Sequence, residues 1–74
     1  METTETEHIR RIHFDQHCLE VGEQPDNPEW LELRTVGAKN IEYFGALNLN
    51  LPLNVAMQLG KALIDAATEK GAKP

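Results

Sequence analysis

The sequence has one cysteine, no long apolar run and few basic residues, and each shortage excludes a class of protein. Because Cys18 is the only cysteine, no disulfide can form within the chain, and we expect a reducing, cytoplasmic location. No segment approaches the roughly 18 consecutive apolar residues of a membrane helix. Residues 1–7 also lack the basic start and apolar centre of a signal peptide. The sequence therefore predicts a cytoplasmic protein that does not interact with membranes.

The scarcity of basic residues makes nucleic acid an unfavourable partner. The chain has 7 Lys and Arg against 12 Asp and Glu, a formal net charge of −5, whereas affinity for a phosphate backbone comes from clustered cations. Acidic residues concentrate between positions 15 and 32, where no Lys or Arg occurs. This segment is either a set of solvated loop and strand faces or a docking surface for a basic protein. The residues predicted to bind such a partner are Glu20, Glu23, Asp26, Glu29 and Glu32, with Trp30 as an aromatic anchor.

A length of 74 residues allows one domain with a small core. At this size folding buries only about 60% of the surface of the unfolded chain, so the core is marginal on its own. Small domains usually compensate with disulfides, a metal or oligomerisation. With disulfides excluded, oligomerisation and a metal remain.

The hydrophobic pattern predicts an α+β fold: a small antiparallel sheet of three to four strands followed by one C-terminal helix packed on one face. Residues 1–7 are expected to be a disordered leader, and residues 8–74 a single domain. A loop over residues 23–28 is marked by Pro25 and Pro28. Alternating apolar and polar residues predict strands at 8–14, 18–21, 30–36 and 41–51, and the helix is expected at about 52–70.

The predicted helix has an apolar arc about twice as wide as the ~100° stripe that one contact surface covers. One part of the arc is expected to pack on the sheet, through Val55, Ala56, Leu59, Leu63, Ala66 and Ala67. A second line on the helix flank consists of Leu53, Met57, Gly60 and Ile64. We expect this flank to pair with a second copy across a two-fold axis, with Gly60 allowing close approach. In the alternative, the N-terminal strand or the proline-rich loop covers it.

His13, Asp15 and His17 are residue types that bind metals, and on one continuous strand they would share a face. Their spacing matches no strong zinc pattern, and a single cysteine cannot supply a second soft ligand. A polar strand face beside a buried Cys18 that behaves as a small hydrophobic residue is therefore favoured, and no metal or cofactor is expected. Catalysis by Cys18 with a neighbouring histidine is disfavoured further, because no third group is available to orient the pair.

Taken together, these features predict a small acidic binding protein, homodimeric and not an enzyme, that acts by occupying another protein. Bacterial accessory proteins and phage-encoded inhibitors or adaptors have this size and character, which is an analogy only. The alternative is a dimer that binds a small molecule or a metal through the histidine-rich N-terminal strand.

Overall fold

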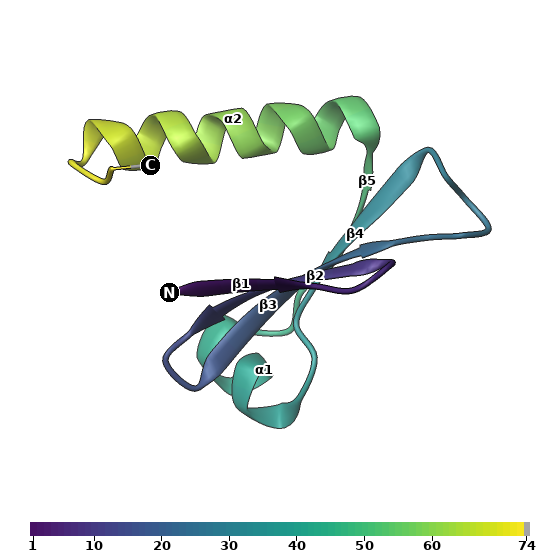
Figure 1. Ribbon diagram of the computed structural model, residues 1–74, viewed down its shortest axis with the longest axis horizontal. Coiled ribbons are helices and arrows are strands. Elements are labelled where there is room, and N and C mark those ends of the chain that lie inside the picture. Colours follow the sequence, from purple (N-terminus) through teal and green to yellow (C-terminus); the bar gives the residue numbers. More distant parts are fainter. Residues whose placement is uncertain (74) are drawn as a thin grey trace.

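The computed structural model describes residues 1–73 and has an α+β fold, as predicted, built from a five-stranded antiparallel sheet and two helices (Figure 1). Pro74, which the predicted domain includes, lies outside the described residues. The strands follow one another in the sheet in chain order. The elements are β1 (Glu2–Glu5), β2 (Ile9–Phe14), β3 (His17–Glu23), β4 (Trp30–Arg34), α1 (Ala38–Phe44), β5 (Asn48–Pro52) and α2 (Leu53–Glu69).

The sheet differs from the prediction at its N-terminal edge. Residues 1–7 were expected to be disordered, but Glu2–Glu5 pair with β2 as an additional edge strand. The Thr3 and Thr4 pair in this segment suits a strand, and hydrogen bonding to β2 outweighs the polar composition that suggested a frayed end. The Oγ1 atom of Thr4 also lies 2.8 Å from Nε2 of His13.

The largest error in the prediction is the strand expected at 41–51, because residues 38–44 form α1 and only residues 48–52 are extended. Gly37 and Gly45 bound this helix with φ values of 97° and 85°, a region that favours glycine. Gly45 ends the helix, where its N–H donates to the carbonyl of Ile41. The alternation of apolar and polar residues at 41–44 therefore occurs in a helix and not in a strand.

Thr35 joins the two ends of the segment between β4 and β5 that contains α1. Its Oγ1 atom donates to the carbonyl of Gly45 and accepts from the N–H of Leu47, at 3.1 and 3.0 Å. The N–H of Thr35 donates to the carbonyl of Leu47 at 3.0 Å. These three hydrogen bonds join the two ends of the α1 segment, so β5 returns beside β4.

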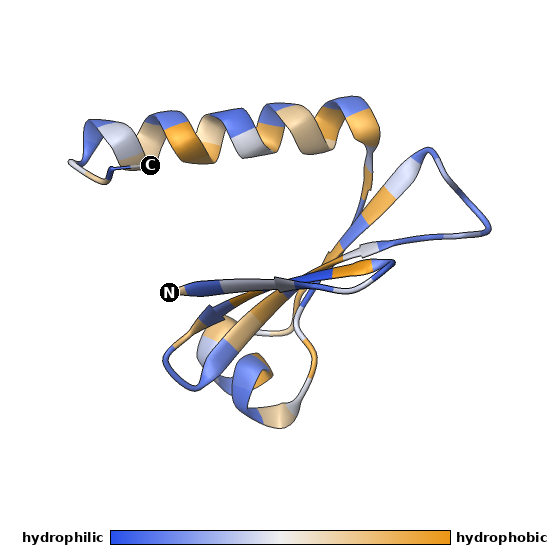
Figure 2. Cartoon of the chain, viewed as in Figure 1, coloured by the Kyte–Doolittle hydropathy of each residue, from blue (hydrophilic) through white to orange (hydrophobic). Residues whose placement is uncertain are grey.

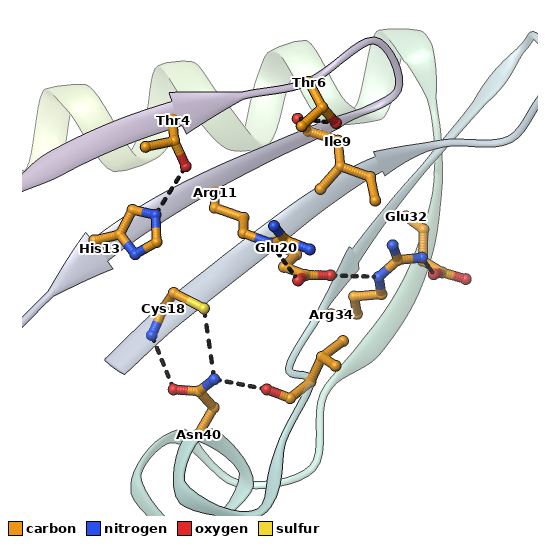
Figure 3. Close-up of polar contacts among 11 residues, drawn as sticks. Thr4, Thr6, Ile9, Arg11, His13, Cys18, Glu20, Glu32, Arg34 and Asn40 are labelled. Carbon is orange, nitrogen blue, oxygen red and sulfur yellow. Dashed lines mark hydrogen bonds and ion pairs between the residues drawn. The ribbon is translucent and has the colours of Figure 1, made fainter. Parts of the chain in front are cut away.

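The register divides the sheet into a polar and an apolar face, because successive side chains of a strand point to opposite sides. Figure 3 looks onto the polar face, with α2 behind the sheet. The polar face carries Thr4, Arg11, His13, Cys18, Glu20, Glu32, Arg34, Asn48 and Asn50. The apolar face carries Ile12, Phe14, Leu19, Val21, Leu31, Leu33, Leu49 and Leu51, together with the polar residues Thr3, Glu5, Arg10, His17 and Glu23.

Helix α2 begins within one residue of its predicted start, directly after β5 with no linker. Pro52 is both the last strand residue and the residue that precedes the helix, with φ −56° and ψ 152°. No side chain caps this end, that of Asn50 included. The amide of Gln24 instead donates to Oδ1 of Asn50 at 2.6 Å.

The predicted packing of the helix along the sheet is wrong for this chain alone. α2 contacts only β4 and β5, and from the β5 junction the helix and the sheet diverge (Figure 1). Within residues 1–73 no hydrophobic side chain is buried, and Val55 and Leu63, which were expected in the core, are 43% and 61% exposed. The isolated chain therefore leaves the apolar surfaces of both helix and sheet largely uncovered. Neither described helix is long and apolar enough to cross a membrane.

Candidate interaction surfaces

The polar face of the sheet is organised around the carboxylate of Glu20, which is 4% exposed. Arg11 lies opposite Glu20 on β2, and Arg34 lies opposite it on β4. The Nε atom of Arg11 donates to one carboxylate oxygen at 2.6 Å, and Nε of Arg34 donates to the other at 3.0 Å (Figure 3). Arg34 also donates through Nη1 to Glu32. These four side chains form a continuous charge network across three strands.

The network favours the charged forms of Glu20 and Arg34. Burial alone raises the pKa of Glu20, but the hydrogen bonds and charges of Arg11 and Arg34 outweigh burial and hold this pKa below its ordinary value. The hydrogen bonds from Glu32 and Glu20 raise the pKa of Arg34. Because its charges are mutually satisfied, we interpret this network as a structural clamp on the sheet.

Gly22 makes room for the clamp. A Cβ atom at this position would lie 3.2 Å from Cζ and Nη1 of Arg34, which is tighter than ordinary van der Waals contact. The absent side chain therefore lets the guanidinium lie flat over β3 between Glu20 and Glu32.

The structure separates the predicted partner-binding acids into two groups. Glu20 and Glu32 belong to the ion network and are not free to meet a partner. Glu23, Asp26 and Glu29 are exposed at or beside the loop that joins β3 to β4. We define these last three residues as the acidic loop. Within the described chain, Asp26 and Glu29 form no ion pair, and Glu23 lies 4.0 Å from Nδ1 of His8.

Trp30 has an internal role beside its predicted one as an anchor. It is half-buried and lines a shallow hollow with Pro25, Pro28 and Leu53. The N–H of Leu53 donates to the carbonyl of Glu29 at 3.1 Å. The proline-rich loop is therefore packed against the start of α2, and the acidic loop lies next to that helix end.

The predicted dimer flank of α2 is open apart from its first residue. Leu53 contacts the hollow at the proline-rich loop, whereas Met57 and Ile64 are 76% and 64% exposed. A Cβ atom added at Gly60 would meet nothing within 4 Å. The alternative in which the leader or the loop covers this flank therefore holds only at Leu53. Apolar bands are visible along the whole of α2 in Figure 2.

The predicted metal candidates do not come together. His13 is the penultimate residue of β2 and His17 begins β3, with Asp15 in the turn between them at φ 52°. The assumption of one continuous strand is wrong, because the chain reverses at Asp15 and places the two histidines on opposite faces of the sheet. In residues 1–73 no group of three or more His, Cys, Asp and Glu side chains is arranged to hold a metal ion.

An aromatic cluster joins α1 to the end of the sheet, and the sequence analysis did not detect it. His17 stacks on Tyr43 with ring centroids 4.3 Å apart, and Tyr43 also contacts Phe14 and Phe44 at 5.9 and 4.8 Å. Asn40 holds the same helix by accepting from the N–H of Cys18 at 2.8 Å. The only signal for this contact in the sequence is the position of the rings. Phe14 and His17 flank the turn at residues 15–16, and Tyr43 and Phe44 directly precede Gly45.

Comparisons with protein-family models, with curated proteins and with solved structures returned no match to this chain. Functional inference therefore rests on the surfaces described above.

Proposed function

We propose that this chain is a small acidic binding protein without a catalytic role, which works as a homodimer and acts by occupying another protein. The observation that carries the proposal is the exposure of α2. A 17-residue amphipathic helix that leaves Met57 and Ile64 in water has an apolar surface typical of an interface rather than of a monomer. Its flank presents the same residues on both copies, as a two-fold interface requires.

The acidic loop is the surface that we assign to the second protein. Glu23, Asp26 and Glu29 are exposed at three-residue intervals, Glu23 at the end of β3 and the other two in the loop packed against Trp30 and the start of α2. Carboxylates on a supported loop attract a basic surface and accelerate its encounter. Glu20 and Glu32 are left out of this assignment because Arg11 and Arg34 already neutralise them.

Light scattering across a micromolar concentration series tests the homodimer, with twice the chain mass as the expected result. A measured particle mass equal to that of one chain at every concentration contradicts the homodimer.

The binding role is tested by using the chain as bait in an extract of its host, followed by measuring affinity for the purified captured protein at low and high salt. The triple variant Glu23→Gln, Asp26→Asn, Glu29→Gln should lose capture, and the wild-type affinity should fall as salt rises. The control neutralises three exposed carboxylates elsewhere, through Glu2→Gln, Glu42→Gln and Glu69→Gln, and should retain capture. Equal capture by both variants contradicts a role for the acidic loop.

A further inference from the structure

The apolar face of the sheet is as poorly covered as the helix. Ile12 and Phe14 on β2 are each 38% exposed, and Leu49 on β5 is 43% exposed. The same side of the sheet faces α2, yet α2 makes contact only near its start. Two apolar surfaces thus diverge from the Pro52 junction with neither covering the other.

The direct junction between β5 and α2 fixes this divergence. Pro52 has a restricted φ, and no loop residue stands between strand and helix. The contact between Leu53 and the proline-rich loop holds the first turn. Swinging the helix down onto its own sheet would have to break these contacts, so the space beside the sheet is open to another segment.

The size of the uncovered surface matches a second copy. The chain exposes 5991 Å², whereas a compact monomer of 8.3 kDa exposes about 4,600 Å² by the scaling of surface with mass. The radius of gyration of 13.0 Å also exceeds the roughly 11 Å expected of a compact chain of this length. The excess is about 1,400 Å² per chain, or about 2,800 Å² for two chains, within the range of obligate homodimers.

We propose that α2 of each copy inserts between the apolar sheet face and α2 of the other copy. The inference rests on the proposed homodimer and specifies its arrangement. One part of the arc, with Val55, Leu59 and Leu63, then packs on the sheet of the second copy, and the flank with Met57, Gly60 and Ile64 meets its helix. This arrangement uses the full width of the helix's apolar arc. A dimer through the helix flanks alone leaves Ile12, Phe14 and Leu49 exposed.

Cross-linking between differently sized chains tests the arrangement. In a Cys18→Ser background, a tagged Leu49→Cys chain is refolded together with an untagged Leu63→Cys chain and treated with a short bifunctional maleimide. Because each chain carries one cysteine, a product of the summed mass reports contact between the helix of one copy and the sheet of the other. We expect this product to dominate. In the control, Asp65→Cys on the polar arc of the helix replaces Leu63→Cys and should give little of it.

The outcomes separate this inference from the homodimer itself. If light scattering shows a dimer while Ile64→Cys cross-links to itself and Leu49→Cys does not cross-link to Leu63→Cys, the helices pair alone and helix insertion is wrong. If one chain carrying both Leu49→Cys and Leu63→Cys cross-links within itself at the mass of one copy, the helix closes on its own sheet. Helix insertion is then wrong, whereas the mass from light scattering decides separately whether the homodimer exists.

Discussion

Replacing Ile64 with aspartate should dissociate the dimer, and the expected magnitude follows from its exposure. Burying an isoleucine side chain contributes roughly 1.5–3 kcal/mol, and Ile64 is 64% exposed in the single chain. Burial of Ile64 against the second copy therefore contributes roughly 1–2 kcal/mol to the free energy of association at each of the two equivalent sites. Desolvating a carboxylate there costs at least as much again, for a total of roughly 5 kcal/mol per dimer. This corresponds to an increase of roughly three to four orders of magnitude in the dimer dissociation constant.

Light scattering at micromolar concentration should show the mass of two copies for the wild type and of one copy for Ile64→Asp. The matched control is Gln58→Asp, which introduces the same residue on the polar arc of the same helix, where position 58 is exposed. Gln58→Asp should keep the mass of two copies. An Ile64→Asp variant with the same mass as the wild type refutes the assignment of this flank to the interface.

Three further predictions concern single positions. Glu20→Gln should lower the free energy of unfolding by about 2 kcal/mol in urea titrations, because it weakens two charge-assisted hydrogen bonds. Because the folded pKa of Glu20 is lowered, its stabilisation is complete above its unfolded pKa of about 4.3 and is lost as pH falls through the folded value. Urea midpoints measured from neutral pH downward should therefore decline less in Glu20→Gln than in the wild type. Gly60→Ala should strengthen the isolated helix by up to about 1 kcal/mol but raise the dimer dissociation constant, and unchanged association in sedimentation contradicts close helix approach. Gly22→Ala should displace Arg34 and destabilise the sheet in the same urea assay. In an Arg34→Ala background, Gly22→Ala should cause no such loss of stability.

Periodicity predicted the elements whose structure depends on local pattern. Helix α2 has a continuous apolar arc over five turns, and its observed bounds agree closely with the prediction. The strands β2, β3 and β4 were also located by alternation, because most of their apolar residues fall on one face. The loop at residues 23–28 followed from its prolines.

The α1 segment could not be predicted in this way, because distant contacts decide its conformation. Residues 41–44 alternate as a strand would, but Asn40 bonds the backbone of Cys18 and Tyr43 stacks on His17, both far away in the sequence. Similarly, the carboxylate of Glu20 was assigned to a partner surface, because the sequence does not show that Arg11 and Arg34 flank it on neighbouring strands. In both cases the residue types were visible in the sequence, but which residues lie next to one another depends on how the strands and helix pair in the fold.

The distribution of contacts implies that sheet and helix owe their stability to different sources. The sheet is held within one copy by four antiparallel ladders and the buried Glu20 network. Helix α2 has less support within one copy, because it contacts only β4 and β5 and diverges from the sheet beyond the β5 junction. Most helical stability in proteins comes from packing of the amphipathic face, and in the proposed homodimer the uncovered sheet face of a second copy supplies that contact. On this reasoning, association completes the hydrophobic core, so a substitution such as Ile64→Asp affects the folding of α2 as well as the number of copies.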